Sequence, residues 1–264
     1  MRAVTSNPKT AGKRQAVEQE PGRRRRPGLL FYTITIAALV ILVALGSWQV
    51  RRLEWKENLI ATIEQRMRGA PLTLDEALAL WRKTGDVDYV PIRLSGVFDH
   101  TKEQDYLATH QGASGWYLYA PLTTADGKTI IVNRGFVPYD LKDASNRPWK
   151  PVDRPVEFVA LARNPLFEKP GWVVPDNDPA NATWYWKDMP SMATAMGLDP
   201  EKVTPFFADI ALSDAPPIEG PIAGVTRVNL PNNHLQYVIT WFGLAAALVL
   251  VAGYYVWRAR NEKD

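Results

Sequence analysis

The chain of 264 residues contains three histidines, and the surroundings of His234 point to chemistry. This imidazole stands at the entrance of an apolar run, 235–257, that carries no charge. An ionisable side chain at membrane depth is a functional candidate, and imidazole is an axial ligand of heme iron. The competing interpretation is a polar residue at the headgroup level that caps a helix together with Asn232 and Asn233.

The helical period predicts which side chains accompany His234. Val238, Trp241 and Ala245 fall on the same face, with Tyr237 beside it. Aromatic planes can pack a porphyrin, and arginines suit its carboxylate groups. The candidate cofactor-binding residues are His234, Trp241, Tyr237, Trp48, Arg51 and Arg52, with His234 as the candidate metal ligand.

A second apolar run, 29–48, is also uncharged. Each run has about the ~20 residues that a helix needs to cross a bilayer, so the sequence predicts two membrane spans. Antiparallel spans place 48–52 at the depth of 234–241. On the first span, Leu45, either Trp48 or Gln49, and Arg52 share a face. Small residues should let the two helices approach closely; they are Ala37, Ala38, Ala44, Gly46 and those of 243–247.

Charge is distributed unevenly along the chain. Residues 1–28 hold eight basic and two acidic side chains, a net charge of +6, and this explains the pI near 9.0. Without a basic patch elsewhere, we expect no nucleic-acid partner. The four arginines 23–26 directly precede the first span, which favours a positive-inside anchor over a nuclear or twin-arginine export signal. A signal-peptidase site at 44–46 is disfavoured, because cleavable apolar regions are shorter.

The same rule predicts the topology. Basic residues flank the N-terminal side of the first span and the C-terminal side of the second, so both termini belong in the cytoplasm or the matrix. The region between the spans is then periplasmic, or lies in the intermembrane space of a mitochondrion. Glu18 and Glu20 are unusual in a mitochondrial presequence. A multi-pass protein of the bacterial cell inner membrane is therefore favoured.

The middle of the chain predicts a mixed domain. Apolar residues at helical spacing extend the first span as a stalk, and Thr73 to Glu76 has the spacing of a capping box. Alternating segments predict strands at 90–98, 105–109, 116–122, 129–137 and 156–163, with two more at 181–187 and 204–210, a hairpin turn at 125–128, and a short helix at 190–196. The expected fold class is a membrane protein with two transmembrane helices flanking an α+β outer domain, built on an antiparallel sheet or small barrel.

The expected organisation follows from these elements. It comprises a disordered basic N-terminus (1–28), a first transmembrane helix (29–48), a helical stalk (49–71), a periplasmic α+β domain (72–228), a second transmembrane helix (235–257) and a cytoplasmic tail (258–264).

Other residue patterns carry weaker signals. His100 and His110 lie near acidic side chains, but solvated loop residues are a commoner explanation than a metal site. Trp172, Trp184 and Trp186 suggest sheet packing. The chain has no cysteine, which excludes disulfides and thiolate chemistry. It also lacks a phosphate-binding loop and a nucleophile elbow.

Three motifs in this order resemble the Surfeit locus protein 1 family, whose members are assembly factors of heme-a-containing cytochrome c oxidases. They are LGSWQVRR at 45–52 followed by Trp55 and Lys56, VNRGFVP at 132–138, and NHLQY at 233–237 followed by Thr240, Trp241 and Phe242. The spans and the domain between them also match, so the resemblance covers 29–257. The family usually has Trp where this chain has Phe136.

The resemblance implies an assembly factor of the respiratory chain rather than an enzyme. Family members in bacteria are associated with binding heme a, as a chaperone does, and helping to deliver it to the large oxidase subunit. The family's second-helix histidine falls on His234. The implied partners are the cytochrome c oxidase large subunit, the heme a synthesis machinery and the lipid bilayer. Arg134 is either a structural ion-pair partner or a docking residue. A tethered scaffold that holds oxidase subunits without a heme role is the alternative function.

Overall fold

The computed structural model describes residues 28–212, 220–226 and 232–261. The predicted disordered segment up to residue 27, with its four arginines, and the last three residues of the predicted tail lie outside them. The chain divides into two compact units, 1–54 with 232–264, and 55–231. We call them the membrane unit and the barrel unit, and each is described separately.

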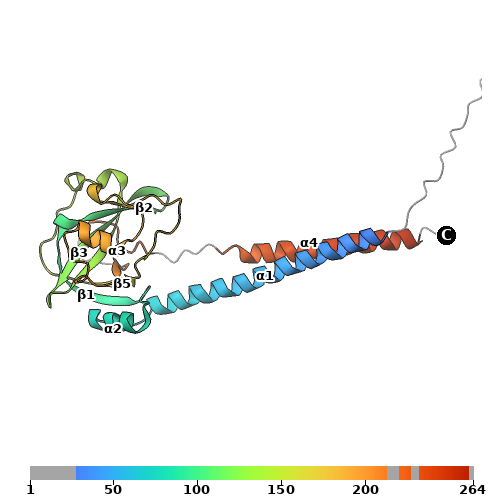
Figure 1. Ribbon diagram of the computed structural model, residues 1–264, viewed down its shortest axis with the longest axis horizontal. Helices are drawn as coiled ribbons and strands as arrows, with labels where there is room; N and C mark the ends of the chain where they lie inside the picture. Colours follow the sequence, from blue (N-terminus) through green and yellow to red (C-terminus); the bar gives the residue numbers. More distant parts are fainter. Residues whose placement is uncertain (1–27, 213–219, 227–231, 262–264) are drawn as a thin grey trace, which may run out of the picture. The chain divides into compact units, whose positions relative to one another are not determined.

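Two long helices form the membrane unit. Helix α1 spans Leu29–Met67, its last turns lying in the barrel unit, and α4 spans His234–Asn261 (Figure 1). Both are long and apolar enough to cross a membrane. The ring centroids of Phe31 and Tyr255 lie 5.1 Å apart, so the first turns of α1 meet the last turns of α4. The two helices are therefore antiparallel, as the sequence predicted.

The small residues that bring the helices together are fewer than expected. A Cβ at Gly46 would lie 2.9 Å from the Phe242 ring, and Ala245 is buried. Gly243, in contrast, has nothing within 4 Å of its Cβ position, and Ala37 and Ala44 are exposed. Of the predicted small residues, Gly46 on α1 and Ala245 on α4 are therefore the ones that are buried in the contact between the helices.

Among its described residues, the barrel unit contains two further α-helices and seven strands. They are α2 (Leu74–Thr84), β1 (Pro91–Phe98), β2 (Gln104–His110), β3 (Ala113–Thr124), β4 (Thr129–Pro138), β5 (Val156–Arg163), β6 (Thr183–Trp184), α3 (Met189–Ala195) and β7 (Phe207–Ile210). The predicted strand at 181–187 is wrong in extent, because a 3₁₀ turn, Pro179–Asn181, precedes it and only two residues pair with β2.

The strands close into a small barrel. Their order is β1-β5-β7-β4-β3-β2-β6, and β1 also pairs with β3 through Gly96–Phe98 and Leu122–Thr124. Five strands thus form the closed ring, and β2 and β6 continue the sheet beyond β3, outside the ring. Most pairs are antiparallel, but β7 runs parallel to β4 and β6 parallel to β2. The expected antiparallel sheet is therefore a mixed one.

Local sequence signals set the ends of several elements. Thr73 caps α2: its hydroxyl accepts from the Glu76 backbone N–H, and the Glu76 carboxylate accepts from the Thr73 N–H at 2.7 Å, the reciprocal bonds of a capping box. Between β3 and β4, Gly127 adopts φ +81° while the Thr124 N–H donates to the Lys128 carbonyl. Glycine suits this left-handed turn, as predicted.

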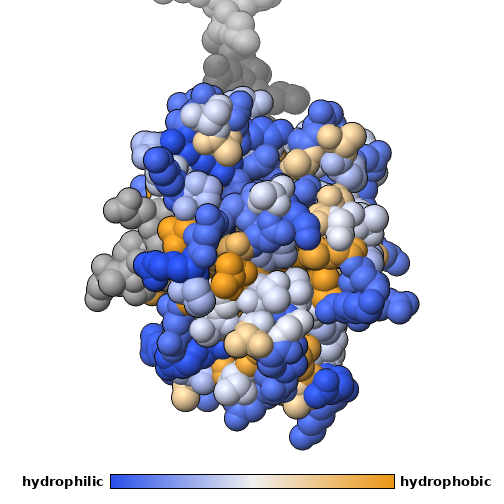
Figure 2. Space-filling view, turned by 90° about the vertical axis from the view of Figure 1, so that its left-hand side faces the viewer, coloured by the Kyte–Doolittle hydropathy of each residue, from blue (hydrophilic) through white to orange (hydrophobic). Residues whose placement is uncertain are grey.

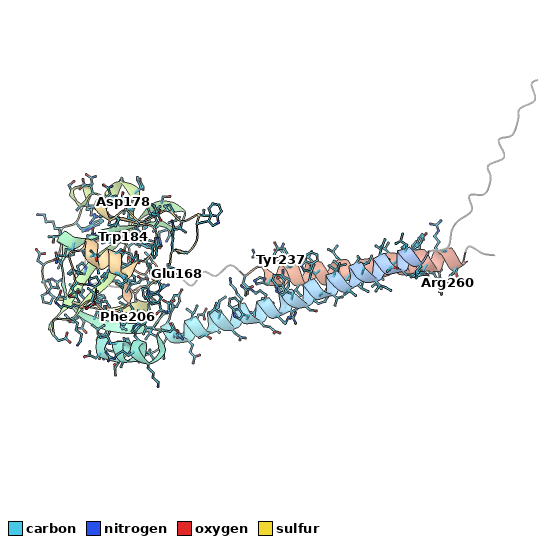
Figure 3. The ribbon with its side chains drawn as sticks, in the orientation of Figure 1. Glu168, Asp178, Trp184, Phe206, Tyr237 and Arg260 are labelled. Carbon is cyan, nitrogen blue, oxygen red and sulfur yellow. The ribbon has the colours of Figure 1, made fainter. Side chains whose placement is uncertain are left out.

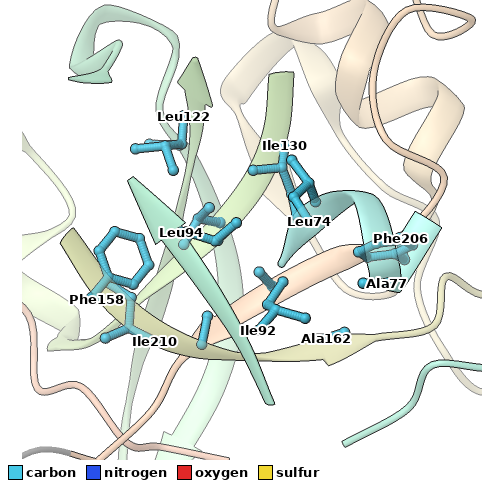
Figure 4. Close-up of a cluster of buried hydrophobic side chains, with 14 of the residues drawn as sticks. Leu74, Ala77, Ile92, Leu94, Leu122, Ile130, Phe158, Ala162, Phe206 and Ile210 are labelled. Atoms are coloured by element: carbon cyan, nitrogen blue, oxygen red, sulfur yellow. The ribbon is translucent and has the colours of Figure 1, made fainter. Parts of the chain in front are cut away.

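Side chains alternate between two apolar clusters along the central strands. Ile130 of β4 points into the barrel with Phe206 and the α2 residues Leu74 and Ala77 (Figure 4), and Val132 belongs to the same cluster. The intervening Ile131 lies outside the barrel, where α3 packs with Trp184 and Phe207. Because both faces of β4 are covered, its residues 130–137 are all buried, including the polar Asn133 and Arg134.

The tryptophan-rich stretch divides in the structure. Trp184 is fully buried and its Nε1–H donates to Gln104 Oε1 at 2.8 Å, whereas Trp172 is 93% exposed. The prediction of sheet packing is therefore wrong for Trp172, since that residue belongs to a long loop after β5. The face of the barrel unit in Figure 2 is mostly hydrophilic, with small separate apolar spots.

Candidate functional site

The imidazole of His234 is held by a residue of the opposite helix. Its Nδ1 lies 2.8 Å from Oε1 of Gln49, and Gln49 is only 8% exposed. His234 is the first residue of α4 and is itself partly buried. The contact therefore joins α1 to the first residue of α4 through one side-chain hydrogen bond.

This hydrogen bond determines which ring nitrogen carries the proton. A carbonyl oxygen only accepts, so Nδ1 must donate to Gln49 Oε1. In the neutral imidazole the lone pair then resides on Nε2, which makes no hydrogen bond among the described residues. Metal-ligating histidines commonly have this arrangement, in which a partner at one nitrogen orients the other toward the metal.

Trp241 lies two helical turns along the same face of α4. It is partly buried, and its Nε1–H is enclosed without a hydrogen-bond partner among the described residues. Buried donors are normally paired. The Trp241 indole N–H is therefore an unsatisfied donor in the described part of the chain.

The other predicted residues are more open. Trp48 is 51% exposed and Tyr237 is 50% exposed, and Arg51 and Arg52 are also exposed. The structure thus places His234 and Trp241, both partly buried, on one face of α4, whereas the other four predicted residues are exposed. Their role in binding a cofactor stays a prediction.

Gln49 is the functional candidate that sequence reasoning did not select. The helical period placed either Trp48 or Gln49 on the face of Leu45, and the aromatic residue was the more conspicuous one. In the structure Gln49 faces His234. Its polar side chain in an otherwise apolar stretch, at the same predicted depth as the imidazole, was the signal that could have identified it.

The barrel unit contains a second concentration of polar groups. Arg134, 3% exposed, donates to Glu103 at 2.9 Å, and Arg147 contacts the other oxygen of the same carboxylate. Burial, before any other cause, lowers the pKa of Arg134, and Glu103 opposes that effect. Because Arg134 is enclosed in an ion pair, its structural role is supported over a docking role.

Asp105 lies next to this cluster: its Oδ1 is 3.9 Å from Nη2 of Arg147 but forms no hydrogen bond among the described residues. Burial, followed by the negative charge of Glu103, raises the pKa of Asp105 to about 6. The Asp105 carboxyl is therefore the group of this cluster that changes its charge near pH 6.

The histidines of the barrel unit do not form a metal centre. Nε2 of His100 lies 3.2 Å from the Val152 carbonyl oxygen, and the His110 ring packs against Phe136 at 5.2 Å. In the part of the chain that the structure describes, no three His, Asp or Glu side chains converge in a way that could hold a metal ion.

The fold and the site define a class of protein: a barrel unit between two candidate membrane spans in the chain, with an imidazole at the first residue of the second span. Residues 36–246 match the SURF1 family model, and the chain belongs to this family. Surfeit locus protein 1 of Rattus norvegicus is 37% identical over 219 residues, which cover 77% of this chain and 68% of the relative.

Two other relatives also match over more than three quarters of this chain. Surfeit locus protein 1 of Homo sapiens is 35% identical over 225 residues, covering 79% of this chain and 71% of the relative. The protein of that name from Takifugu rubripes is 32% identical over 236 residues, covering 83% and 92%. The resemblance seen in the three sequence motifs is thus confirmed over most of the chain.

Proposed function

We propose that this protein is an assembly factor of heme-a-containing cytochrome c oxidase that binds heme a and assists its insertion into the large subunit. Membership of the family supports the role in assembly. The heme proposal depends on one observation, the hydrogen bond from His234 Nδ1–H to Gln49 Oε1. Through it the protein presents the Nε2 lone pair of a fixed imidazole.

The residues of the site fit a bound heme. When bound, the group supplies an iron centre that accepts a nitrogen lone pair. Gln49 fixes the tautomer and the orientation of the His234 ring, and the unpaired Trp241 N–H can donate to an oxygen of the ligand. Arg51 and Arg52, both exposed, are the proposed charged partners of its carboxylates. A single protein ligand suits a cofactor that is received from its synthesis machinery and passed on.

The absorption spectrum tests this proposal. The protein is purified from cells that make heme a, and the bound heme is quantified per chain. His234→Ala should remove most of the heme, whereas His110→Ala, which removes an imidazole from the barrel unit, should leave it unchanged. Equal amounts of heme in the two variants would show that His234 is not a heme ligand.

Variants of Gln49 test the hydrogen bond itself. Gln49→Leu removes the acceptor, so the imidazole is free to rotate or change tautomer, and we expect a 10- to 100-fold loss of heme affinity, as is typical of lost outer-shell partners. Gln49→Glu keeps an acceptor and should retain heme while shifting its spectrum. A Leu variant that binds as tightly as the parent would show that the contact does not orient the ligand.

We also propose that the protein is a multi-pass component of the bacterial cell inner membrane, with both termini in the cytoplasm and the barrel unit in the periplasm. The four arginines that precede α1 in the sequence and Arg258 and Arg260 in the last turn of α4 support this orientation. The Phe31–Tyr255 contact supports termini on one side. Reporter fusions check it: a periplasm-active phosphatase should be active when inserted at Ala125–Lys128 and inactive at the C-terminus. The reverse pattern would invert the topology.

A second candidate function, a scaffold for oxidase subunits, is favoured by an exposed apolar loop. Its tip carries Phe167, 83% exposed, Trp172, 93% exposed, and Val173, 73% exposed. The base is closed, because the Leu166 N–H donates to the Lys187 carbonyl and Asn177 Oδ1 accepts from the Tyr185 N–H. A structured loop with exposed large apolar side chains is typical of a protein contact.

Co-purification separates the two functions. Replacing Phe167 and Trp172 by Ser should reduce the amount of large oxidase subunit that co-purifies, without changing the heme bound per chain. Leu212→Ser serves as the control, because Leu212 is 83% exposed outside this loop. If less large subunit co-purifies with His234→Ala but not with the loop variant, the heme role is favoured. The loop is then not the site of contact with the oxidase.

A further inference from the structure

A groove lies between α1 and α4 at the end of the membrane unit away from His234. Its volume is about 430 Å³, and Phe31, Tyr32 and Thr35 of α1 line it together with Gly253, Trp257 and Arg260 of α4. Figure 3 labels Arg260 near the C-terminal end of α4 and Tyr237 near its beginning. The groove therefore belongs to a different part of the helix pair from the imidazole.

The lining explains why the groove exists. Ala252 and Gly253 fill little space on α4, and a Cβ added at Gly253 would meet nothing within 4 Å. The aromatic side chains in the lining are Phe31, Tyr32 and Trp257, and the Phe31 ring packs against Tyr255 at 5.1 Å between ring centroids. The result is an apolar channel lined by aromatic and small side chains.

A single charged side chain contributes to this lining. Arg260 is exposed, and it forms no ion pair with any of the described residues. The sequence adds positive charge at the same end, because four arginines, 23–26, precede α1 by two residues. A guanidinium with five donors matches the oxygens of a phosphate group.

We propose that this groove binds an anionic phospholipid of the adjacent leaflet, with an acyl chain along the apolar channel and the headgroup phosphate at Arg260. Hydrocarbon alone would not distinguish one lipid from another, since every bilayer lipid supplies it. Arg260 adds the charge selection, as basic pockets between membrane helices do for anionic headgroups. This inference does not depend on heme binding at His234.

Lipid retention tests the charge selection. The full chain is purified in mild detergent, and the bound phospholipids are quantified by native mass spectrometry. Arg260→Gln should lower retained phosphatidylglycerol and cardiolipin at least fivefold. The matched control is Arg258→Gln, which removes the same charge from the same helix end but does not line the groove. Equal losses in the two variants would show that general attraction, not a site, holds the lipid.

Filling the groove tests its shape independently of charge. Gly253→Leu places a side chain in the channel, whereas Gly243→Leu adds the same side chain to α4 at another position with open space. Only the first should lower lipid retention, while both should keep the helical signal of the parent. Unchanged anionic lipid in Gly253→Leu would overturn the proposal.

The identity of the occupant is tested in the membrane. Because the chain has no cysteine, Gly253→Cys provides a unique cross-linking position. We expect the cross-linker to recover phospholipid adducts. Efficient cross-linking to another protein chain would instead make the groove a helix-docking surface and would refute the lipid site.

Discussion

The barrel unit and the membrane unit differ in the contacts that hold each of them together internally. In the barrel unit the central strands are buried on both faces, and even charged groups such as Arg134 and Glu103 are enclosed as pairs. In the membrane unit only 6% of the apolar stretch of either helix is buried. The helices meet through Gly46 against Phe242, ring contacts at one end, and Gln49 with His234 at the other.

This difference indicates where each unit obtains its stability. The barrel buries apolar surface away from water, which is the dominant favourable term in folding. Two helices in lipid gain little from that effect, so close packing and hydrogen bonds between them matter more. The membrane unit should consequently tolerate changes on its lipid-facing surface and be sensitive at its few contacts.

The largest effect is expected from breaking the buried ion pairs of the barrel unit. Glu103→Gln leaves Arg134 and Arg147 enclosed without their shared carboxylate, and such a loss costs about 3–5 kcal/mol. Chemical denaturation of the full chain in detergent measures it. Glu157→Gln is the control, because the Arg93–Glu157 pair is exposed and is worth at most about 1 kcal/mol. Similar costs for both variants would show that enclosing the Glu103 ion pairs adds nothing to the stability of the barrel unit.

A smaller and opposite effect is expected at Asp105. Its folded pKa of about 6 lies above the ordinary value of 3.8, so the folded protein retains a proton that the unfolded chain releases. The contribution of this group to stability should therefore fall as pH rises from about 4 to about 6 and stay constant above. Asp105→Asn removes this dependence and should stabilise the protein at neutral pH by up to about 3 kcal/mol.

The measurement is a series of unfolding midpoints between pH 4 and pH 7, taken as the difference between the parent and Asp105→Asn. Glu168→Gln, which changes an exposed carboxylate of the loop, corrects for general charge effects. A difference that does not vary with pH would mean that Asp105 is not protonated in the folded protein over this range.

In the membrane unit, Gly46→Leu should weaken the helix pair. The added side chain meets the Phe242 ring, and overpacking of this kind costs about 1–3 kcal/mol. Thermal loss of the helical circular dichroism signal in detergent measures it, with Gly243→Leu as the tolerated counterpart. Adding Phe242→Ala should restore part of the stability of Gly46→Leu. Without such recovery, the two residues are not in contact.

The smallest effect is expected at the cap of α2. Thr73→Ala removes one of the two reciprocal hydrogen bonds with Glu76, at a cost of about 1 kcal/mol, and Thr73→Ser should cost less because it keeps the hydroxyl. The unfolding midpoint of the full chain reports both. A cost comparable to that of Glu103→Gln would show that local capping, rather than burial, dominates this region.

The sequence predicted the elements that depend on local patterns. The apolar length of the two spans, the Thr73–Glu76 spacing and the turn around Gly127 each have a local physical cause, and the structure confirms the corresponding elements. The barrel, too, was among the expected outcomes, because alternating strands with a short hairpin favour a curled sheet.

The features that were not predicted depend on contacts distant in the chain. β7 is only four residues long and lies between β5 and β4, an order that no local pattern reveals. Trp172 resembles a core residue in composition, yet the loop that carries it leaves the sheet. Gln49 became visible as a candidate only when α4 was placed against α1. In each case the deciding partner lies far away in the sequence.

The position of β7 has a consequence for biosynthesis. Its residues Phe207–Ile210 close the ring, yet they leave the ribosome after every other strand and shortly before α4. Until then β4 and β5 present unpaired edges, which invite association with other chains. A nascent or truncated chain that ends before Phe207 should therefore be a substrate for chaperones and proteases, even though four-fifths of its length has been translated.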